Sequence, residues 1–68
     1  MAKGILTKRE RDVFELLIIN KTTKEIGQIL NISEKTVRNH ISNVIQKLGA
    51  NGRAGAVVEL LKLEELSL

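Results

Sequence analysis

Three polar residues, Arg38, Asn39 and Ser42, stand at helical spacing in a segment whose other side is apolar. An arginine can form two hydrogen bonds with the edge of a guanine, an asparagine two with an adenine, and a serine can bond bases or phosphates. A helix fits the major groove of B-form DNA, and its N-terminal part usually contacts the bases. We therefore predict that these three residues read the bases of double-stranded DNA.

Other polar and basic residues around them could hold the DNA backbone. The start of a helix favours a phosphate, because its first N–H groups are free and its dipole is positive there. Lys47 has an alternative role, since a lysine near the end of a helix also stabilises that helix. The predicted phosphate or flanking contacts are Lys21, Thr22, Thr23, Lys24, Lys35, Thr36, Asn43, Gln46, Lys47 and Arg53.

The distribution of charge also favours a partner that carries phosphates. The chain has 68 residues and a net charge of +3. Residues 20–53 contain six basic and two acidic residues, whereas residues 54–68 contain one basic and three acidic residues. Glu34 is the only acid in residues 34–48, although exposed helix surfaces usually carry several. A solvated surface with randomly placed charges is the alternative.

The composition excludes several classes of protein. With no cysteine, the chain has neither a disulfide framework nor a thiolate metal site. One phenylalanine and no tryptophan or tyrosine leave no stacking platform for single-stranded nucleic acid. No apolar run is long enough to span a membrane, so we expect no membrane partner and a cytoplasmic protein that associates with the nucleoid.

The chain shows no arrangement of residues that suits catalysis. Its carboxylates are scattered, so we predict no catalytic residue, no metal ligand, no cofactor and no small-molecule ligand. The single histidine, His40, borders an apolar stripe. A half-buried position with a local hydrogen bond is more common for such a residue than a phosphate contact or a protonation switch.

Apolar residues that recur every three or four positions predict an all-α fold with four helices. Thr7 and Thr22 each precede a glutamate by three residues, which is the spacing of a capping box at a helix start. Ser33 would cap the third helix, Gly49 would end it, and Asn51 would cap the fourth. The predicted helices cover residues 8–19, 23–30, 34–48 and 53–63.

A very short connection joins the second and third predicted helices. Only Asn31, Ile32 and Ser33 separate them, and such a connection makes two helices cross steeply, as in a helix-turn-helix. Asn31 suits the left-handed backbone that would end the second helix, and Ile32 should point into the core. Gly27 should leave room where the third helix passes close by. An ordinary helical hairpin is the alternative.

The last predicted helix has more apolar surface than one small core needs. Exposed apolar patches on small proteins usually mark contacts with a partner. We predict a two-fold homodimer whose interface holds Ala54, Val58, Leu61 and Lys62, with two reading helices on one side of the DNA. The alternative is a fraying tail whose apolar residues cover the core. We expect one domain over residues 1–68, with a helix-turn-helix unit at about 23–48 and a dimerisation helix at about 53–66.

Several motifs follow one another along nearly the whole chain: Leu6–Arg11, Thr23–Ile26, Ile32–His40, Lys47–Gly49 and Arg53. In this order they resemble the LuxR-type helix-turn-helix family. The chain departs from the family at Gly27, where alanine is usual, and at Asp12, where glutamate is commoner.

The resemblance implies a four-helix DNA-binding domain that dimerises through its last helix and regulates transcription. It carries the base contacts over to Arg38, Asn39 and Ser42. The likeness is greatest to short regulators of sporulation, which implies a stand-alone regulator of late sporulation genes, with RNA polymerase as a further candidate partner. The rival hypothesis is a helical protein-interaction module that dimerises through its last helix without specific DNA readout.

Overall fold

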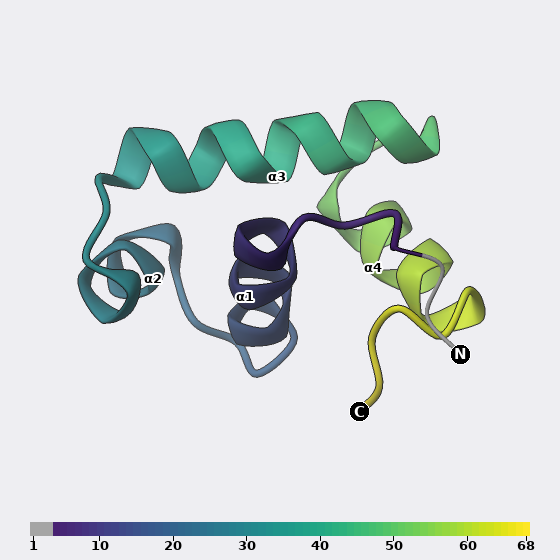
Figure 1. Cartoon of the computed structure of the whole chain (residues 1–68), viewed down its shortest axis with the longest axis horizontal. Coiled ribbons are helices and arrows are strands. Elements are labelled where there is room, and N and C mark those ends of the chain that lie inside the picture. Colours follow the sequence, from purple (N-terminus) through teal and green to yellow (C-terminus); the bar gives the residue numbers. More distant parts are fainter. Residues whose placement is uncertain (1–3) are drawn as a thin grey trace.

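The computed structural model describes residues 4–68, and every regular element in that range is helical. The helices are α1 (Lys8–Leu17), α2 (Thr23–Leu30), α3 (Glu34–Leu48) and α4 (Arg53–Lys62). The long helix α3 runs along one edge of the molecule, and α1, α2 and α4 all lie on its other side (Figure 1). The predicted all-α fold with four helices is confirmed.

The core forms where the apolar stripes of the four helices meet. Phe14 of α1 is fully buried and is the largest side chain at the centre. Because α3 packs against each of the other helices, its apolar stripe faces all of them and its polar side is left to solvent. The buried apolar residues are Leu6, Val13, Phe14, Ile26, Val37, Ile41, Val44, Ala56, Leu60 and Leu66.

The predicted capping boxes start α1 and α2. In the second box, the Thr22 hydroxyl accepts from the Glu25 backbone N–H at 3.1 Å, and the Thr22 N–H donates to the Glu25 carboxylate at 2.9 Å. This backbone hydrogen bond from Thr22 holds the pKa of Glu25 below its ordinary value. Thr7 makes the same two bonds with Glu10. Each box satisfies donors that the first turn of a helix otherwise leaves free.

The turn between α2 and α3 has the predicted geometry, with one difference. Asn31 adopts the left-handed conformation, with φ of 60°, and the half-buried Ile32 packs against the core. A Cβ atom on Gly27 would lie 2.8 Å from the Ile32 carbonyl oxygen. Gly27 therefore makes room chiefly for the turn itself, rather than for the body of the third helix as we predicted.

Helix α1 ends two residues before the predicted position. Asn20 has a φ of 71°, and the Lys21 N–H donates to the Leu16 carbonyl at 3.1 Å. Asparagine tolerates the left-handed region better than most residues, so the chain can turn sharply there.

At the other end of the molecule, Asn51 does not cap α4 as predicted. The N-cap is Gly52, and no side-chain hydrogen bond caps this helix.

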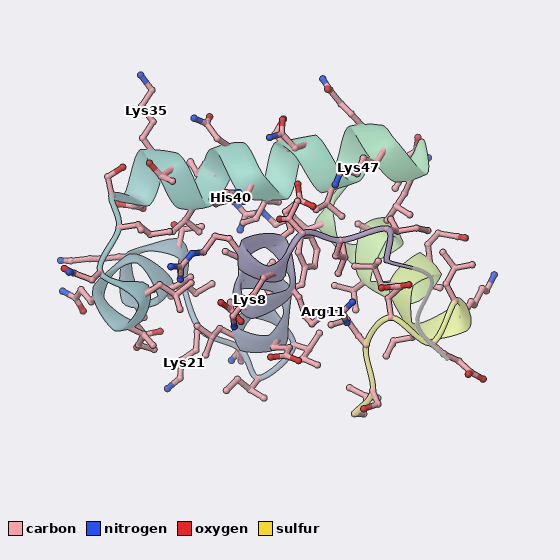
Figure 2. All side chains as sticks on the ribbon, viewed as in Figure 1. Lys8, Arg11, Lys21, Lys35, His40 and Lys47 are labelled. Carbon is pink, nitrogen blue, oxygen red and sulfur yellow. The ribbon has the colours of Figure 1, made fainter. Side chains whose placement is uncertain are left out.

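The prediction of a dimerisation helix that continues to residue 66 is wrong. Helix α4 ends at Lys62, Glu64 has a φ of 60°, and the N–H groups of Glu65 and Leu66 both donate to the Leu60 carbonyl. The chain thus folds back and buries Leu66 in the core. Arg11 holds this C-terminal segment: its guanidinium donates to the Glu65 carbonyl and, at 2.8 Å, to the Glu65 carboxylate (Figure 2).

Candidate nucleic-acid interface

The exposed side of α3 is polar along its length. Val37, Ile41 and Val44 are buried and so fix the rotation of the helix about its axis. Lys35 points directly away from the rest of the molecule (Figure 2). The exposed residues of this side, which we call the α3 outer face, are Lys35, Arg38, Asn39, Ser42, Asn43 and Gln46. All three predicted base readers are among them.

The residues of the α3 outer face do not share one line. Helical periodicity puts Lys35, Asn39, Ser42 and Gln46 along its centre. Arg38 lies on one margin, next to Glu34. Asn43 is on the other margin together with the half-buried Thr36, whose hydroxyl is 2.9 Å from that of Ser33.

Glu34 joins the predicted base reader Arg38 to the start of α2. One carboxylate oxygen of Glu34 accepts from Arg38 Nη2 at 2.7 Å and from the Thr23 hydroxyl at 2.8 Å. We did not assign a role to Glu34 from the sequence. Its spacing of four residues from Arg38 is the signal that could have revealed the pair, because side chains four apart meet on a helix.

The start of α2 supplies the predicted phosphate-binding groups. The backbone N–H groups of Thr23 and Lys24 find no acceptor within residues 4–68, as expected for the first turn of a helix. Lys24 is exposed. Lys21, in contrast, extends to the opposite side of the molecule from Lys35 (Figure 2), so the structure does not bring it to the α3 outer face.

The Lys47 side chain is 37% exposed, but its ammonium is directed at Glu10 of α1, which argues against its predicted phosphate contact. Its ammonium donates to the Glu10 carboxylate at 2.5 Å and to the Ile5 carbonyl at 3.0 Å. The Glu10 side chain is only 5% exposed. Burial by itself raises the pKa of Glu10, but hydrogen bonds from Lys47 and Thr7 outweigh it and hold this pKa below its ordinary value. Lys47 therefore ties the end of α3 to α1.

His40 is half-buried, as predicted, on the side of α3 that faces α1 (Figure 2). This position sets it apart from the α3 outer face.

Arg53 is exposed at the start of α4, on a different element from the other predicted phosphate contacts.

The predicted dimer residues lie on α4 with unequal exposure. Ala54 and Lys62 are exposed, and Val58 is 49% exposed. Leu61 is half-buried and packs against the core. Leu63, just beyond the end of α4, is 37% exposed and adds apolar surface outside the predicted interface residues. Leu61, a predicted interface residue, contributes to the core, and so does Leu66 of the segment after α4, as in the alternative of a tail whose apolar residues cover the core.

No other kind of site is visible in the described part of the chain. Residues 4–68 enclose no pocket, and no three of their His, Asp and Glu side chains gather in a way that could hold a metal ion. None of the helices in this range is both long and apolar enough to cross a membrane.

Comparison with known proteins finds relatives along the whole chain. The spore germination protein GerE of Bacillus subtilis (strain 168) is 69% identical over 67 residues, which are 98% of this chain and 90% of GerE. A solved structure of the transcription factor GerE is 60% identical, has a TM-score of 0.93, and covers 96% of this chain and 97% of its own. The transcriptional regulatory protein DegU of Brevibacillus brevis is 50% identical over 58 residues, which are 85% of this chain and 25% of DegU.

The match to a known family agrees with the four-helix fold. The family described as "Bacterial regulatory proteins, luxR family" matches residues 4–60. GerE is a transcription factor, not an enzyme, and the predicted absence of catalysis agrees with this. The chain therefore belongs to the luxR family of bacterial regulatory proteins and is a DNA-binding transcription regulator of the GerE type.

Proposed function

We propose that the chain binds specific double-stranded DNA sites as a homodimer, with α3 in the major groove and Arg38, Asn39 and Ser42 on the bases. The observation that carries this proposal is the α3 outer face. It is exposed and rich in hydrogen-bonding groups, and Glu34, the one acid of α3, is already paired with Arg38. Arginine and asparagine are the side chains that recognise guanine and adenine best in that groove.

The genes that it controls are, in this proposal, those expressed late in sporulation. The likeness to a spore germination protein over nearly the full length of both chains supports this assignment. The regulator would act in the cytoplasm, bound to the nucleoid. RNA polymerase is the partner expected when the protein binds next to a promoter. Selecting bound sites from a random duplex library, and locating them in the genome, tests both the sequence specificity and the set of genes.

Contacts with the DNA backbone are proposed around the α3 outer face. The free N–H groups at the start of α2 and the exposed Lys24 are among them. Lys47 is left out because Glu10 holds its ammonium, and Lys21 because it points away. The proposed phosphate or flanking contacts are Thr22, Thr23, Lys24, Lys35, Thr36, Asn43, Gln46 and Arg53.

We expect Lys24→Ala to weaken binding to every duplex by a similar factor. A lysine that contacts phosphate releases counterions, so its loss should lower the slope of log K against log salt by about 0.9. Fluorescence anisotropy over a salt series, on a preferred and a random duplex, measures both quantities. Lys8→Ala, which removes an exposed lysine of α1 that is not among the proposed contacts, is the control and should leave the slope unchanged. A loss of affinity for the preferred duplex alone would contradict a phosphate contact.

The dimer proposed through α4 is tested with Val58→Asp. An aspartate in an apolar contact between two protomers would lose its water, so we expect the dimer to weaken by at least about tenfold. Sedimentation equilibrium at about tens of micromolar should show a dimer for the native chain and a monomer for the variant. Ile29→Asp changes a residue of similar exposure, 53%, on α2 and should leave the dimer intact. A monomeric native chain under these conditions would contradict the dimer of the free protein.

A further inference from the structure

We propose that Glu34 is a positioning residue for base recognition: it sets the direction of Arg38 and limits binding to wrong sequences. This inference rests on the proposed function, in which Arg38 contacts a base. Three observations support it: the shared hydrogen bonds of the Glu34 carboxylate, the place of Glu34 in the fold, and its charge at the edge of the α3 outer face.

The Glu34 carboxylate is fixed by two helices at once. Its Oε2 atom accepts from Arg38, one turn along α3, and from the hydroxyl of Thr23, which belongs to α2. Glu34 is also the first residue of α3 and follows directly after the turn that Gly27 and Asn31 shape. The point to which Arg38 is attached is therefore defined by the helix-turn-helix itself.

Arg38 held in this way can still recognise a base. Its side chain is 58% exposed, and only Nη2 donates to Glu34, so the other N–H groups of the guanidinium remain for the DNA. A long side chain that is already ordered loses less conformational entropy when it binds. The direction of the Arg38 side chain also decides which base pair it reaches. The ion pair with Glu34 restricts that direction.

Whereas the ordering of Arg38 favours the specific contact, the charge of Glu34 weakens non-specific binding. Affinity for DNA of any sequence comes mainly from basic groups near phosphates. A carboxylate beside Arg38 offsets one of these positive charges and repels the backbone. Glu34 thus lowers affinity for all sequences while it keeps Arg38 in place for the correct one, and this raises the ratio of specific to non-specific affinity.

Two variants of Glu34 test this role. Glu34→Ala removes both the charge and the acceptor, so we expect about threefold tighter binding to a random duplex. We expect its discrimination at the base pair read by Arg38 to fall by about tenfold. Glu34→Gln removes the charge but keeps an acceptor, and it should retain more of that discrimination. Asp12→Asn weakens the surface pairs of Asp12 with Lys8 and Arg9 within α1 and serves as the control, with discrimination unchanged.

A positioning role differs from a general structural effect in one measurable way. The loss of discrimination in Glu34→Ala should occur at one base pair and should require Arg38. Binding is measured on the preferred duplex and on every single-base-pair variant, with the native chain, Glu34→Ala, Arg38→Ala and the double variant. Discrimination should fall in Glu34→Ala only where Arg38→Ala abolishes it, and the double variant should discriminate no worse than Arg38→Ala alone.

The outcomes distinguish this inference from the proposed function. If Arg38→Ala changes base preference but Glu34→Ala does not, or if Glu34→Ala lowers discrimination evenly at all positions, the positioning role is refuted and the reading role of Arg38 stands. If Arg38→Ala leaves every base preference unchanged, the reading role fails, and the role of Glu34 fails with it.

Discussion

Arg38→Ala should bind its preferred duplex about 10- to 100-fold more weakly, with the loss concentrated at one base pair of each half-site. The reason is chemical: alanine cannot supply the paired donors that an arginine offers to the edge of a guanine. Affinity for random duplex should also fall, because one cation is lost and the charge of Glu34 is uncovered. This factor should be smaller, since a random duplex offers no matching base contact to lose.

The measurement compares binding to the preferred duplex with binding to its single-base-pair variants. For Arg38→Ala, one of these variants should bind as well as the preferred duplex. Arg53→Ala removes another exposed arginine, at the start of α4, and should weaken all duplexes alike. Native base preference in Arg38→Ala would show that the base-reading residues are wrongly assigned.

Lys47→Met should lower the free energy of unfolding by about 3 kcal/mol at neutral pH, since it leaves a buried carboxylate without its partner. The Glu10 side chain is 5% exposed, and Lys47 is its cationic partner. A domain of this size has only about 3–5 kcal/mol of stability in total, so the variant should be partly unfolded at physiological temperature. Chemical denaturation in the cold, extrapolated to zero denaturant, measures the difference.

The same pair predicts how stability depends on pH. The pKa of Glu10 lies below its ordinary value of 4.5 in the folded protein. Its stabilising contribution is therefore complete above that ordinary value and is lost as the pH falls through the lower, folded-state pKa. In Lys47→Met, burial favours a protonated Glu10, so the gap between the variant and the native chain should narrow in acid.

Lys8→Met gives the matched control for this experiment. It breaks the surface pair with Asp12, whose charged atoms are 3.8 Å apart, and should change stability by less than about 1 kcal/mol. If Lys47→Met keeps native stability but lowers the salt slope of DNA binding, the result would support the phosphate contact predicted from the sequence and contradict the structural role of Lys47.

The features that could be predicted from the sequence depend on residues close together in the chain. The two capping boxes need a threonine and a glutamate three residues apart, and the turn needs Asn31 within a short connection. The rotation of α3 follows from its apolar stripe, so the exposed position of Arg38 could be predicted too. In each case the information lies within about one or two helical turns.

The features that could not be predicted depend on partners far apart in the chain. Nothing near Lys47 indicates that its ammonium meets Glu10, 37 residues away. The segment that folds back after α4 is likewise held by a hydrogen bond between Arg11 and Glu65, which are 54 residues apart. Local patterns are the same for a lysine that contacts phosphate and a lysine that pairs inward, so only the packed structure separates them.

The Glu10 carboxylate links events that would otherwise be independent. One oxygen accepts both from the Thr7 N–H, at the start of α1, and from Lys47, near the end of α3. Fraying of the first turn of α1 would therefore also release the last turn of α3 and expose the buried acid. These two helix ends should open as one cooperative unit, so the last turn of the helix presented to DNA should fray only when the first turn of α1 frays as well.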